Sequence, residues 1–295
     1  MRIAIITGGV SGERDVSINS AKNLQTVLNL DDSVVFVFPE DQASFQDRIA
    51  EFHIAIPIIH GVGGEDGAIQ EYLESVNLPY LFSNPRTHKS ALDKRFTKQV
   101  AKDLGINIAT EIAGPSPTFP LFAKPNFGGS SIASQLCTST LELQKLMQNN
   151  PSEDFLLEEP VFGREFTVGV IQHHSVAQSL PVVEIISHNG VFDYQSKYDS
   201  EYLAEEICPA NIHPELEKTL KESALLIHNS IGAKHLTRSD FMVSKNGKVY
   251  FLEINTIPGL TKTSLIPKML LAQGVDIRSL FLGWCDETLR RLEAQ

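Results

Sequence analysis

The sequence predicts an α/β protein built from more than one compact unit, and three observations support this prediction. In residues 1–84, short apolar runs alternate with helical segments, as in a doubly wound parallel sheet. Two of these runs end in glycine-rich loops, and parallel sheets bind ligands at the carboxyl ends of their strands. Near residue 85 the chain changes to longer β-rich runs and polar loops, which favours an α+β arrangement. A chain of 295 residues has room for two or three such units.

The hydrophobic pattern predicts the elements in order. In the first unit we expect strands at 3–6, 34–38, 54–59 and 80–82, with helices at 15–28 and 68–75. A polar stretch at 84–93 then leads into a helix at 94–104, and β-rich runs follow at 121–125, 155–159 and 165–171. A later helix has one apolar face and is expected to end at Gly232; that face carries Leu216, Leu220, Ala224, Ile227 and Ile231.

Composition excludes several classes of protein. Apolar residues make up 42 % of the chain, which is too many for a disordered protein. The net charge of −11 disfavours nucleic acid as a partner, because phosphate backbones need a basic face. Cys137, Cys208 and Cys285 are widely spaced, so neither a disulfide framework nor a zinc site is expected. The first apolar run is too short for a signal peptide, and no run approaches the ~20 residues of a membrane helix. We therefore expect a cytoplasmic protein.

Two β-rich runs near the C-terminus are joined through Asn246 and Gly247, a dipeptide that is a strong hairpin signal. If these two residues form the whole loop, the hairpin register is fixed, and each residue of the first strand faces a defined residue of the second. Side chains alternate along each strand, so four polar residues would share one face of the hairpin. They would face each other in the pairs Asp240–Glu253 and Arg238–Asn255.

This polar face predicts a metal site. Carboxylates that face each other across two strands repel, so a cation is expected between Asp240 and Glu253. Two carboxylates and an amide oxygen suit Mg²⁺, and Arg238 suits a phosphate. A solvated strand face is the less favoured interpretation, because most of the opposite face would be apolar, with Phe241, Val243, Leu252 and Ile254.

A second phosphate signal follows the run that ends at Lys124. The loop after it contains Gly128-Gly129-Ser130-Ser131, whose backbone N–H groups suit phosphates, and the lysine adds a positive charge. The spacing differs from that of a P-loop. Gly8-Gly9 also lacks the dinucleotide-binding spacing, which disfavours a dehydrogenase.

Several motifs in fixed order resemble the D-alanine–D-alanine ligase family of the ATP-grasp superfamily. They lie at 8–17, at 60–67 (His-Gly-x-Gly-Gly-Glu-Asp-Gly), at 93–94, at 124–131, at 197–198 and at 238–265. The resemblance implies a pre-ATP-grasp domain at 1–84 for substrate binding and dimerisation. It further implies a two-part ATP-grasp fold, with a central subdomain at 85–161 and a C-terminal subdomain with the metal and catalytic sites at 162–295.

The resemblance also implies residue roles. It assigns the binding of ATP to six residues: Lys94, Lys124, Ser131, Glu158, Glu165 and Lys197. It assigns two Mg²⁺ ions, for which Mn²⁺ can substitute, to Asp240, Glu253 and Asn255, with Glu253 bridging. For the two D-alanine molecules it implies Glu13, which would bind the first ammonium group, together with His60, Arg238, Ser264 and Leu265. For catalysis it implies Glu13, Ser130, Tyr198, Arg238 and the backbone of Gly259.

Some further segments carry their own expectations. We expect a mobile lid at 197–206, and we expect Glu65 and Asp66 to cap the helix that follows them. The pair His173-His174 is expected in a solvated turn. Ala133 stands where the family often has glycine, which matters only if φ is positive there.

The implied activity is ATP-dependent ligation of two D-alanine molecules through an acyl phosphate, for peptidoglycan synthesis, by a cytoplasmic homodimer. Ligation of D-alanine to D-lactate or D-serine remains an alternative, and so does a nucleotide-binding module without catalysis. The second alternative predicts loss of a metal carboxylate or a phosphate lysine, and all are present. Tyr198 favours an amine acceptor, because a neutral phenol gives anionic lactate no advantage.

Overall fold

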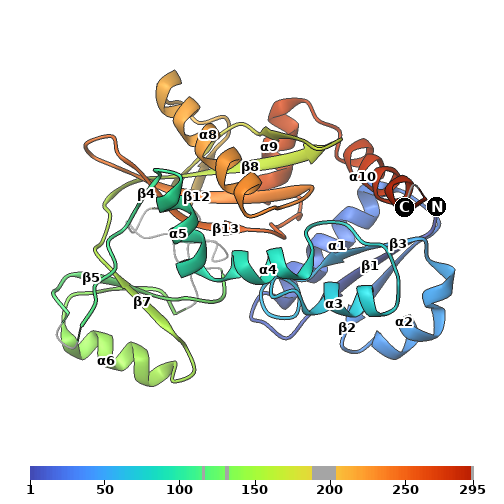
Figure 1. The fold of residues 1–295 in the computed structure, drawn as a ribbon, viewed down its shortest axis with the longest axis horizontal. Coiled ribbons are helices and arrows are strands. Elements are labelled where there is room, and N and C mark those ends of the chain that lie inside the picture. Colours follow the sequence, from blue (N-terminus) through green and yellow to red (C-terminus); the bar gives the residue numbers. More distant parts are fainter. Residues whose placement is uncertain (115–116, 130–132, 188–203, 294–295) are drawn as a thin grey trace.

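The computed structural model describes residues 1–114, 117–129, 133–187 and 204–293. Within these ranges the chain forms three β-sheets, as Figure 1 shows. The first is a parallel N-terminal sheet, the second is a large mixed sheet, and the third is a small antiparallel sheet. The predicted α/β fold class with a mixed C-terminal part is therefore confirmed.

The N-terminal sheet is parallel, has the strand order β2-β1-β3, and is covered on both faces. Alternate residues of β1 point to opposite sides, so Ile3 and Ile5 pack with α1, whereas Ala4 and Ile6 pack with α2 and α3. The doubly wound arrangement is thus confirmed. Its elements are β1 (Ile3–Gly8), α1 (Arg14–Leu28), β2 (Ser33–Phe38), α2 (Gln42–Arg48), a 3₁₀ turn (Ile49–Glu51), β3 (Ile54–Ile58) and α3 (Ala68–Ser75).

The large sheet has the strand order β11-β10-β8-β12-β13-β4, and β9 pairs with β8. Helices α5 and α8 cover one face, where Ala101 and Leu220 join a core with Phe166, Phe241 and Phe251. Its elements are α5 (Lys94–Asp103), β4 (Asn107–Ile108), β8 (Gly163–His173), β9 (Val176–Ser179), β10 (Val183–Ile186), β11 (Glu205–Ile207), α8 (Pro214–Ser230), β12 (Leu236–Ser244) and β13 (Val249–Asn255). Gly232 follows α8 with φ +69°, so the predicted helix end is confirmed.

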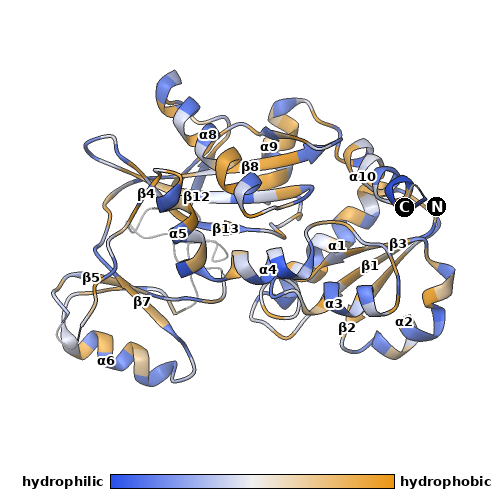
Figure 2. Ribbon diagram, in the orientation of Figure 1, coloured by the Kyte–Doolittle hydropathy of each residue, from blue (hydrophilic) through white to orange (hydrophobic). Residues whose placement is uncertain are grey.

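The small sheet has the order β6-β5-β7, and α6 packs on it through Leu143 and Leu146. Figure 2 shows apolar residues concentrated along the strands of the sheets. None of the described helices is both long and apolar enough to span a bilayer. The elements of this unit are β5 (Leu121–Pro125), β6 (Gln135–Cys137), α6 (Thr140–Asn149) and β7 (Phe155–Glu158).

The C-terminal helices return to the N-terminal unit. Helix α9 (Leu265–Gln273) brings Ile266 and Met269, and helix α10 (Ile277–Glu293) brings Phe281 and Trp284, into the core that contains β1 and α1. Figure 1 accordingly shows α10 next to α1 and close to the N-terminus. Strand β4, from the range predicted for the central subdomain, also pairs with β13 of the large sheet. The domain limits at 84/85 and 161/162 stay a prediction.

Two N-terminal expectations were wrong. The expected strand at 80–82 is a single parallel bridge between Tyr80 and Ala55. The polar stretch at 84–93 contains a helix, α4 (Pro85–Leu92). Asn84 caps it by accepting a hydrogen bond from the Thr87 N–H (2.9 Å), and proline stands at the first helical position. The capping signal therefore outweighed the low hydrophobicity of this segment.

The β12–β13 hairpin has the predicted site register but not the predicted loop. Asp240 faces Glu253 and Arg238 faces Asn255, as expected. The strands are joined by residues 245–248, however, and Val243 pairs with Val249. That pairing alone would set Asp240 opposite Leu252, but a β-bulge after Asp240 restores the register. Leu252 consequently lines a cavity instead of the apolar face.

Ala133 has φ +57°, in the left-handed region that costs a residue with a Cβ roughly 1–2 kcal/mol. We predict that Ala133→Gly raises the free energy of unfolding by roughly 0.5–1 kcal/mol, because relief of strain exceeds the entropy cost of glycine. Chemical denaturation measures the change. Ala272→Gly, at an exposed position within α9, is the matched control and should destabilise by about 1 kcal/mol. An equal decrease in the free energy of unfolding in both variants would contradict backbone strain at Ala133.

Candidate active site

A cavity of about 500 Å³ lies where the three sheets meet. It is lined by loops of the N-terminal unit, by β5 and β7 of the small sheet, and by β12 and β13 of the large sheet. Seven of the predicted site residues line it: Glu13, Lys94, Lys124, Glu158, Glu165, Asp240 and Glu253. The fold therefore brings together residues that are up to 240 positions apart in the chain.

Asp240 accepts hydrogen bonds from three side chains. Arg238 donates to both of its oxygens, from Nε to Oδ1 (2.9 Å) and from Nη2 to Oδ2 (2.8 Å). Thr167 Oγ1 donates to Oδ1 (2.5 Å), and Asn255 Nδ2 donates to Oδ2 (3.2 Å). Burial opposes the charge of Arg238, but the charge and hydrogen bonds of Asp240 outweigh it and raise the pKa of the guanidinium.

Glu253 faces Asp240 and is approached by a different cation. Lys94 Nζ lies 3.4 Å from Glu253 Oε2 and donates to the Gly128 carbonyl (2.6 Å). Lys94 begins α5, and Asp93 caps that helix by accepting from the Phe96 N–H (3.1 Å). The two opposed carboxylates and the neighbouring Asn255 amide supply oxygen donors, which are the hard ligands that Mg²⁺ prefers.

Glu158 lies between two lysines, one of which sequence reasoning missed. Lys124 Nζ is 3.1 Å from Glu158 Oε2, and Lys98 forms an ion pair with Oε1. Burial opposes ionisation of Glu158, but Lys124 and Lys98 outweigh it and lower its pKa. Burial, followed by repulsion from Lys124, lowers the pKa of Lys98 to about 8. Lys98 lies one turn after Lys94, and that spacing was the only sequence signal for it.

Glu13 lies between the N-terminal loops and the glycine-rich loop of the small sheet. A Cβ at Gly61 would lie 3.4 Å from Glu13 Oε2, and a Cβ at Gly129 would lie 3.3 Å from it. Glycine at these two positions therefore lets both loops approach the carboxylate closely. Ser130, the predicted partner of Glu13, lies outside the described residues, and so do the predicted site residues Ser131, Lys197 and Tyr198. The lid expected at 197–206 is described only from residue 204, and its last two residues begin β11.

The predicted residues after β13 form a compact loop. A Cβ at Gly259 would lie 2.9 Å from Ser264 Oγ, so glycine permits the close approach of these two residues. Ser264 precedes the first residue of α9, Leu265, whose side chain belongs to the core. Any contact of Leu265 with a substrate carboxylate would therefore use its backbone N–H, at a helix N-terminus that suits an anion.

His60 is buried and faces the loop after β13. Its Nδ1 donates to the Ile257 carbonyl (2.7 Å), and its Nε2 lies 3.4 Å from Ser20 Oγ. Burial lowers the pKa of the imidazole, which favours the neutral ring that these contacts require. His60 is not among the residues that line the described part of the cavity, so a substrate contact by its side chain stays a prediction.

The expected capping by Glu65 was wrong, whereas that by Asp66 is confirmed. Asp66 accepts from the N–H of Ala68, the first residue of α3 (3.0 Å). Glu65 is buried and accepts from the Gly61 N–H (2.9 Å) and the Ile257 N–H (3.2 Å). Burial, reinforced by the charge of Glu13, raises the pKa of Glu65 to about 7.

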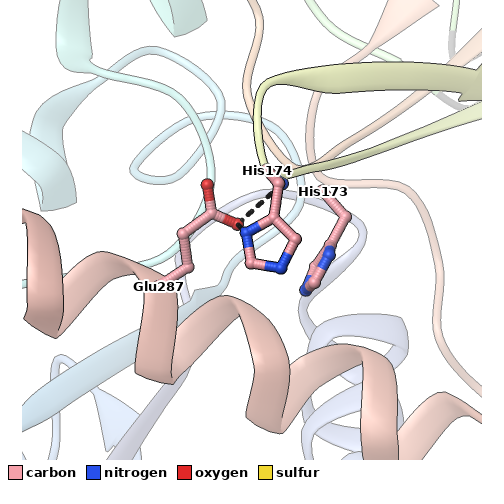
Figure 3. A group of neighbouring side chains, drawn as sticks. All are labelled: His173, His174 and Glu287. Atoms are coloured by element: carbon pink, nitrogen blue, oxygen red, sulfur yellow. Dashed lines mark hydrogen bonds and ion pairs between the residues drawn. The ribbon is translucent and has the colours of Figure 1, made fainter.

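A second polar cluster lies away from the cavity, at the β8–β9 turn (Figure 3). Ligand atoms of His173, His174 and Glu287 lie within 4.8 Å of one another. Glu287 already accepts from the His174 N–H (2.9 Å) and pairs with Arg291. A Cβ at Gly283 of α10 would lie 2.8 Å from His173 Nε2, so glycine makes room for that ring. The cluster fastens the turn to α10, and the His174 side chain stays 71 % exposed, as expected for a solvated turn.

These features define the class of protein. A cavity between a small antiparallel sheet and a larger mixed sheet, with lysines on one side and opposed carboxylates on the other, is the architecture of an ATP-grasp enzyme. The family model described as D-ala D-ala ligase C-terminus matches residues 95–282.

The chain belongs to the D-alanine–D-alanine ligase family. It is 36 % identical over 294 residues to the D-alanine–D-alanine ligase of Lawsonia intracellularis, with 93 % of this chain and 94 % of the relative covered. The Bacillus anthracis D-alanine–D-alanine ligase complexed with ATP superposes with a TM-score of 0.80 at 26 % identity, over 99 % of this chain and 98 % of that one. The VanG D-Ala:D-Ser ligase of Enterococcus faecalis shares the fold, with a TM-score of 0.78 at 23 % identity and 99 % and 98 % coverage.

The raised pKa of Glu65 predicts a pH-dependent stability. Its ordinary value is 4.5 and its folded value is about 7, so the fold favours the protonated acid. The stability that this preference contributes is complete below pH 4.5 and is lost as the pH rises through 7. Between pH 4.5 and 8, the free energy of unfolding of wild type should therefore fall by up to about 3 kcal/mol relative to that of Glu65→Gln.

Urea unfolding of the nucleotide-free protein at pH 5 and pH 8 measures this difference. Glu40→Gln is the control, because hydrogen bonds to its backbone and to Arg14 lower the pKa of Glu40 from 4.5; its carboxyl is then ionised in both states over most of this range, and the wild-type to Glu40→Gln difference in unfolding free energy should stay nearly constant. A wild-type to Glu65→Gln difference that stays constant between the two pH values would contradict the assignment.

Proposed function

We propose that this chain joins two D-alanine molecules into D-alanyl-D-alanine at the expense of ATP, in the cytoplasm, for peptidoglycan synthesis. One observation carries the proposal: a carboxylate suited to an ammonium group, lysines suited to phosphates and an opposed carboxylate pair line a single cavity. Membership of the family supports the choice of substrate. A homodimer formed through the N-terminal unit is a further part of the proposal.

The lysine side of the cavity would bind ATP. Lys94 and Lys124 would contact its phosphates, while Glu158 and Glu165 would contact the adenine and the ribose. Lys98 and Lys124 share the single carboxylate of Glu158, so this group of three carries a net positive charge that favours a polyphosphate. Ser131 and Lys197 are proposed to complete the binding of ATP.

The hairpin side would hold two Mg²⁺ ions through Asp240, Glu253 and Asn255, with Mn²⁺ as a substitute. Bound there, the ions would supply positive charge to the phosphoryl group during transfer. The oxygen donors fit this use because Asp240 and Glu253 face each other and both line the cavity. Arg238 and Lys94 hold the two carboxylates in place from either side.

The proposed reaction has two steps. A carboxylate oxygen of the first D-alanine attacks the γ-phosphorus of ATP, and ADP leaves. The neutral amine of the second D-alanine then attacks the acyl carbon, and inorganic phosphate leaves with the bridging oxygen. Glu13 would hold the first ammonium group, so that its carboxylate points towards the phosphate side of the cavity.

The negative charge of the tetrahedral intermediate would be stabilised by Arg238 and by the backbone N–H of Gly259. Ser264 and the backbone of Leu265 would hold the carboxylate of the second substrate. Water must be excluded because it would hydrolyse the acyl phosphate. We propose that the segment at 197–206 closes over the site, with Tyr198 and Ser130 linking it to Glu13.

The acceptor is tested by measuring ADP release and products with D-alanine, L-alanine, D-lactate and D-serine. The proposal expects D-alanyl-D-alanine as the main product at pH 7, including when D-alanine and D-lactate compete at equal concentration. Mostly ester product would overturn the dipeptide assignment and leave the ATP chemistry intact. ADP release without any condensed product would overturn the ligase assignment itself.

Arg238→Ala should lower kcat by a factor on the order of 10²–10³, the usual loss for one donor to a developing oxyanion. Steady-state kinetics with saturating ATP and D-alanine measures this loss. Arg278→Ala is the control, because Arg278 donates to the Leu28 carbonyl (2.8 Å) away from the cavity, and kcat should stay near the wild-type value. A change confined to KM would mean that Arg238 contributes ground-state binding only.

A further inference from the structure

The loop at 257–260 is held by side chains of the N-terminal unit on both sides of Gly259. The backbone N–H of Ile257 donates to Glu65 (3.2 Å), and its carbonyl accepts from His60 (2.7 Å). The backbone N–H of Leu260 donates to Ser20 Oγ (3.1 Å), and its carbonyl accepts from Asn23 Nδ2 (2.7 Å). We call these four side chains, Glu65, His60, Ser20 and Asn23, the bracket.

The four bonds come from only two places. Ser20 and Asn23 lie on neighbouring turns of α1, whose first turn follows Glu13. His60 and Glu65 belong to the loop after β3, and that loop approaches Glu13 through Gly61. Ser20 also lies 3.4 Å from His60 Nε2, so the two halves of the bracket are in contact. The elements that position Glu13 therefore also position the loop that carries Gly259.

We propose that the bracket is a positioning device for the ligation step and that Asn23 is one of its positioning residues. Asn23 would hold the Leu260 carbonyl, and with it the backbone that follows Gly259, so that the Gly259 N–H keeps its direction towards the oxygen on the reacting carbon, at a fixed offset from Glu13. This inference rests on the proposed function, because the role of the Gly259 N–H belongs to it. It adds residues outside the cavity that act on catalysis through the backbone.

The bracket would act by preorganising the oxyanion donor. An oxyanion donor is effective when its direction is fixed before the reaction, because reorienting it costs free energy at the transition state. Gly259 has no Cβ and follows Pro258, between a buried Ile257 and a buried Leu260. The four bonds to the N–H and carbonyl groups of Ile257 and Leu260 hold the peptide units on both sides of the Pro258–Gly259 peptide, so the N–H of Gly259 is held by its surroundings.

The residues of the bracket differ in how well they test the idea. Changes at His60, Ser20 or Glu65 each leave buried polar groups without a partner and disturb the fold. Asn23 is only half-buried, and within the part of the chain that the structure describes its side chain donates one hydrogen bond, to the Leu260 carbonyl. The same helix offers a matched control in Gln25, which is also half-buried and donates to a backbone carbonyl, that of Ser33 (3.0 Å) within the N-terminal unit.

The experiment compares Asn23→Ala with Gln25→Ala in the full chain. Both variants lose one side-chain bond to a carbonyl, so a comparable small drop in melting temperature is expected for both. Asn23→Ala should lower kcat for D-alanyl-D-alanine formation by roughly tenfold, within the range reported for small misplacements of reacting groups, and should leave KM for ATP unchanged. Gln25→Ala should keep the wild-type kcat.

Hydrogen–deuterium exchange of the amides at 256–262 gives a second readout that does not depend on activity. Exchange there should be faster in Asn23→Ala than in wild type and unchanged in Gln25→Ala. The near-isosteric Asn23→Asp replaces the donor with an oxygen and should behave like the alanine variant, which keeps the test valid if Asn23→Ala folds poorly.

Unchanged kcat in both Asn23 variants, whatever the exchange rates, would overturn the positioning role. Unchanged exchange at 256–262 would overturn the bracket itself. If the wild type formed no D-alanyl-D-alanine, the proposed function would fail, and the exchange result would still decide whether Asn23 fixes this loop.

Discussion

Two carboxylates on neighbouring strands, Asp240 and Glu253, set the main electrostatic constraint on this molecule. Their repulsion must be balanced, and the fold places a cation beside each of them. Arg238 binds Asp240 from the same strand, and Lys94 reaches Glu253 from the start of α5. The strands β12 and β13, the helix α5 and the glycine-rich loop that accepts from Lys94 are thereby tied together around a cavity suited to phosphates and metal ions.

The N-terminal unit completes this cavity from the other side. It contributes Glu13 at the beginning of α1, and through Ser20, Asn23, His60 and Glu65 it holds the loop that leaves β13. Glu65 illustrates the cost of this arrangement, since its charge is buried near that of Glu13 and the fold favours its protonated form. Glu65 accepts hydrogen bonds from two loops at once and so orders the site. Its ionisation at neutral pH nevertheless lowers the free energy of unfolding.

The sequence predicted the sheet pairing of the site well and the long-range contacts poorly. Alternation and the Asn246-Gly247 signal placed Asp240 opposite Glu253, although a bulge, and not a two-residue loop, produces that register. The partners of Lys98, Glu65 and Asn23 were missed, because neither the Lys94–Lys98 spacing nor the motif around Glu65 indicates a group far along the chain. Their partners are Glu158, Ile257 and Leu260, which lie 60, 192 and 237 residues away. Only the packing of the three sheets brings such groups together.

The central claim is that ATP activates a carboxylate as an acyl phosphate, and oxygen transfer tests this most directly. D-Alanine labelled with ¹⁸O in its carboxylate is converted in the presence of ATP, and the inorganic phosphate and nucleotide products are analysed by mass spectrometry. The account predicts one labelled oxygen in each phosphate formed and none in the nucleotide, because the acyl carbon–oxygen bond breaks in the second step. Unlabelled phosphate, or label in a nucleotide product, would contradict it.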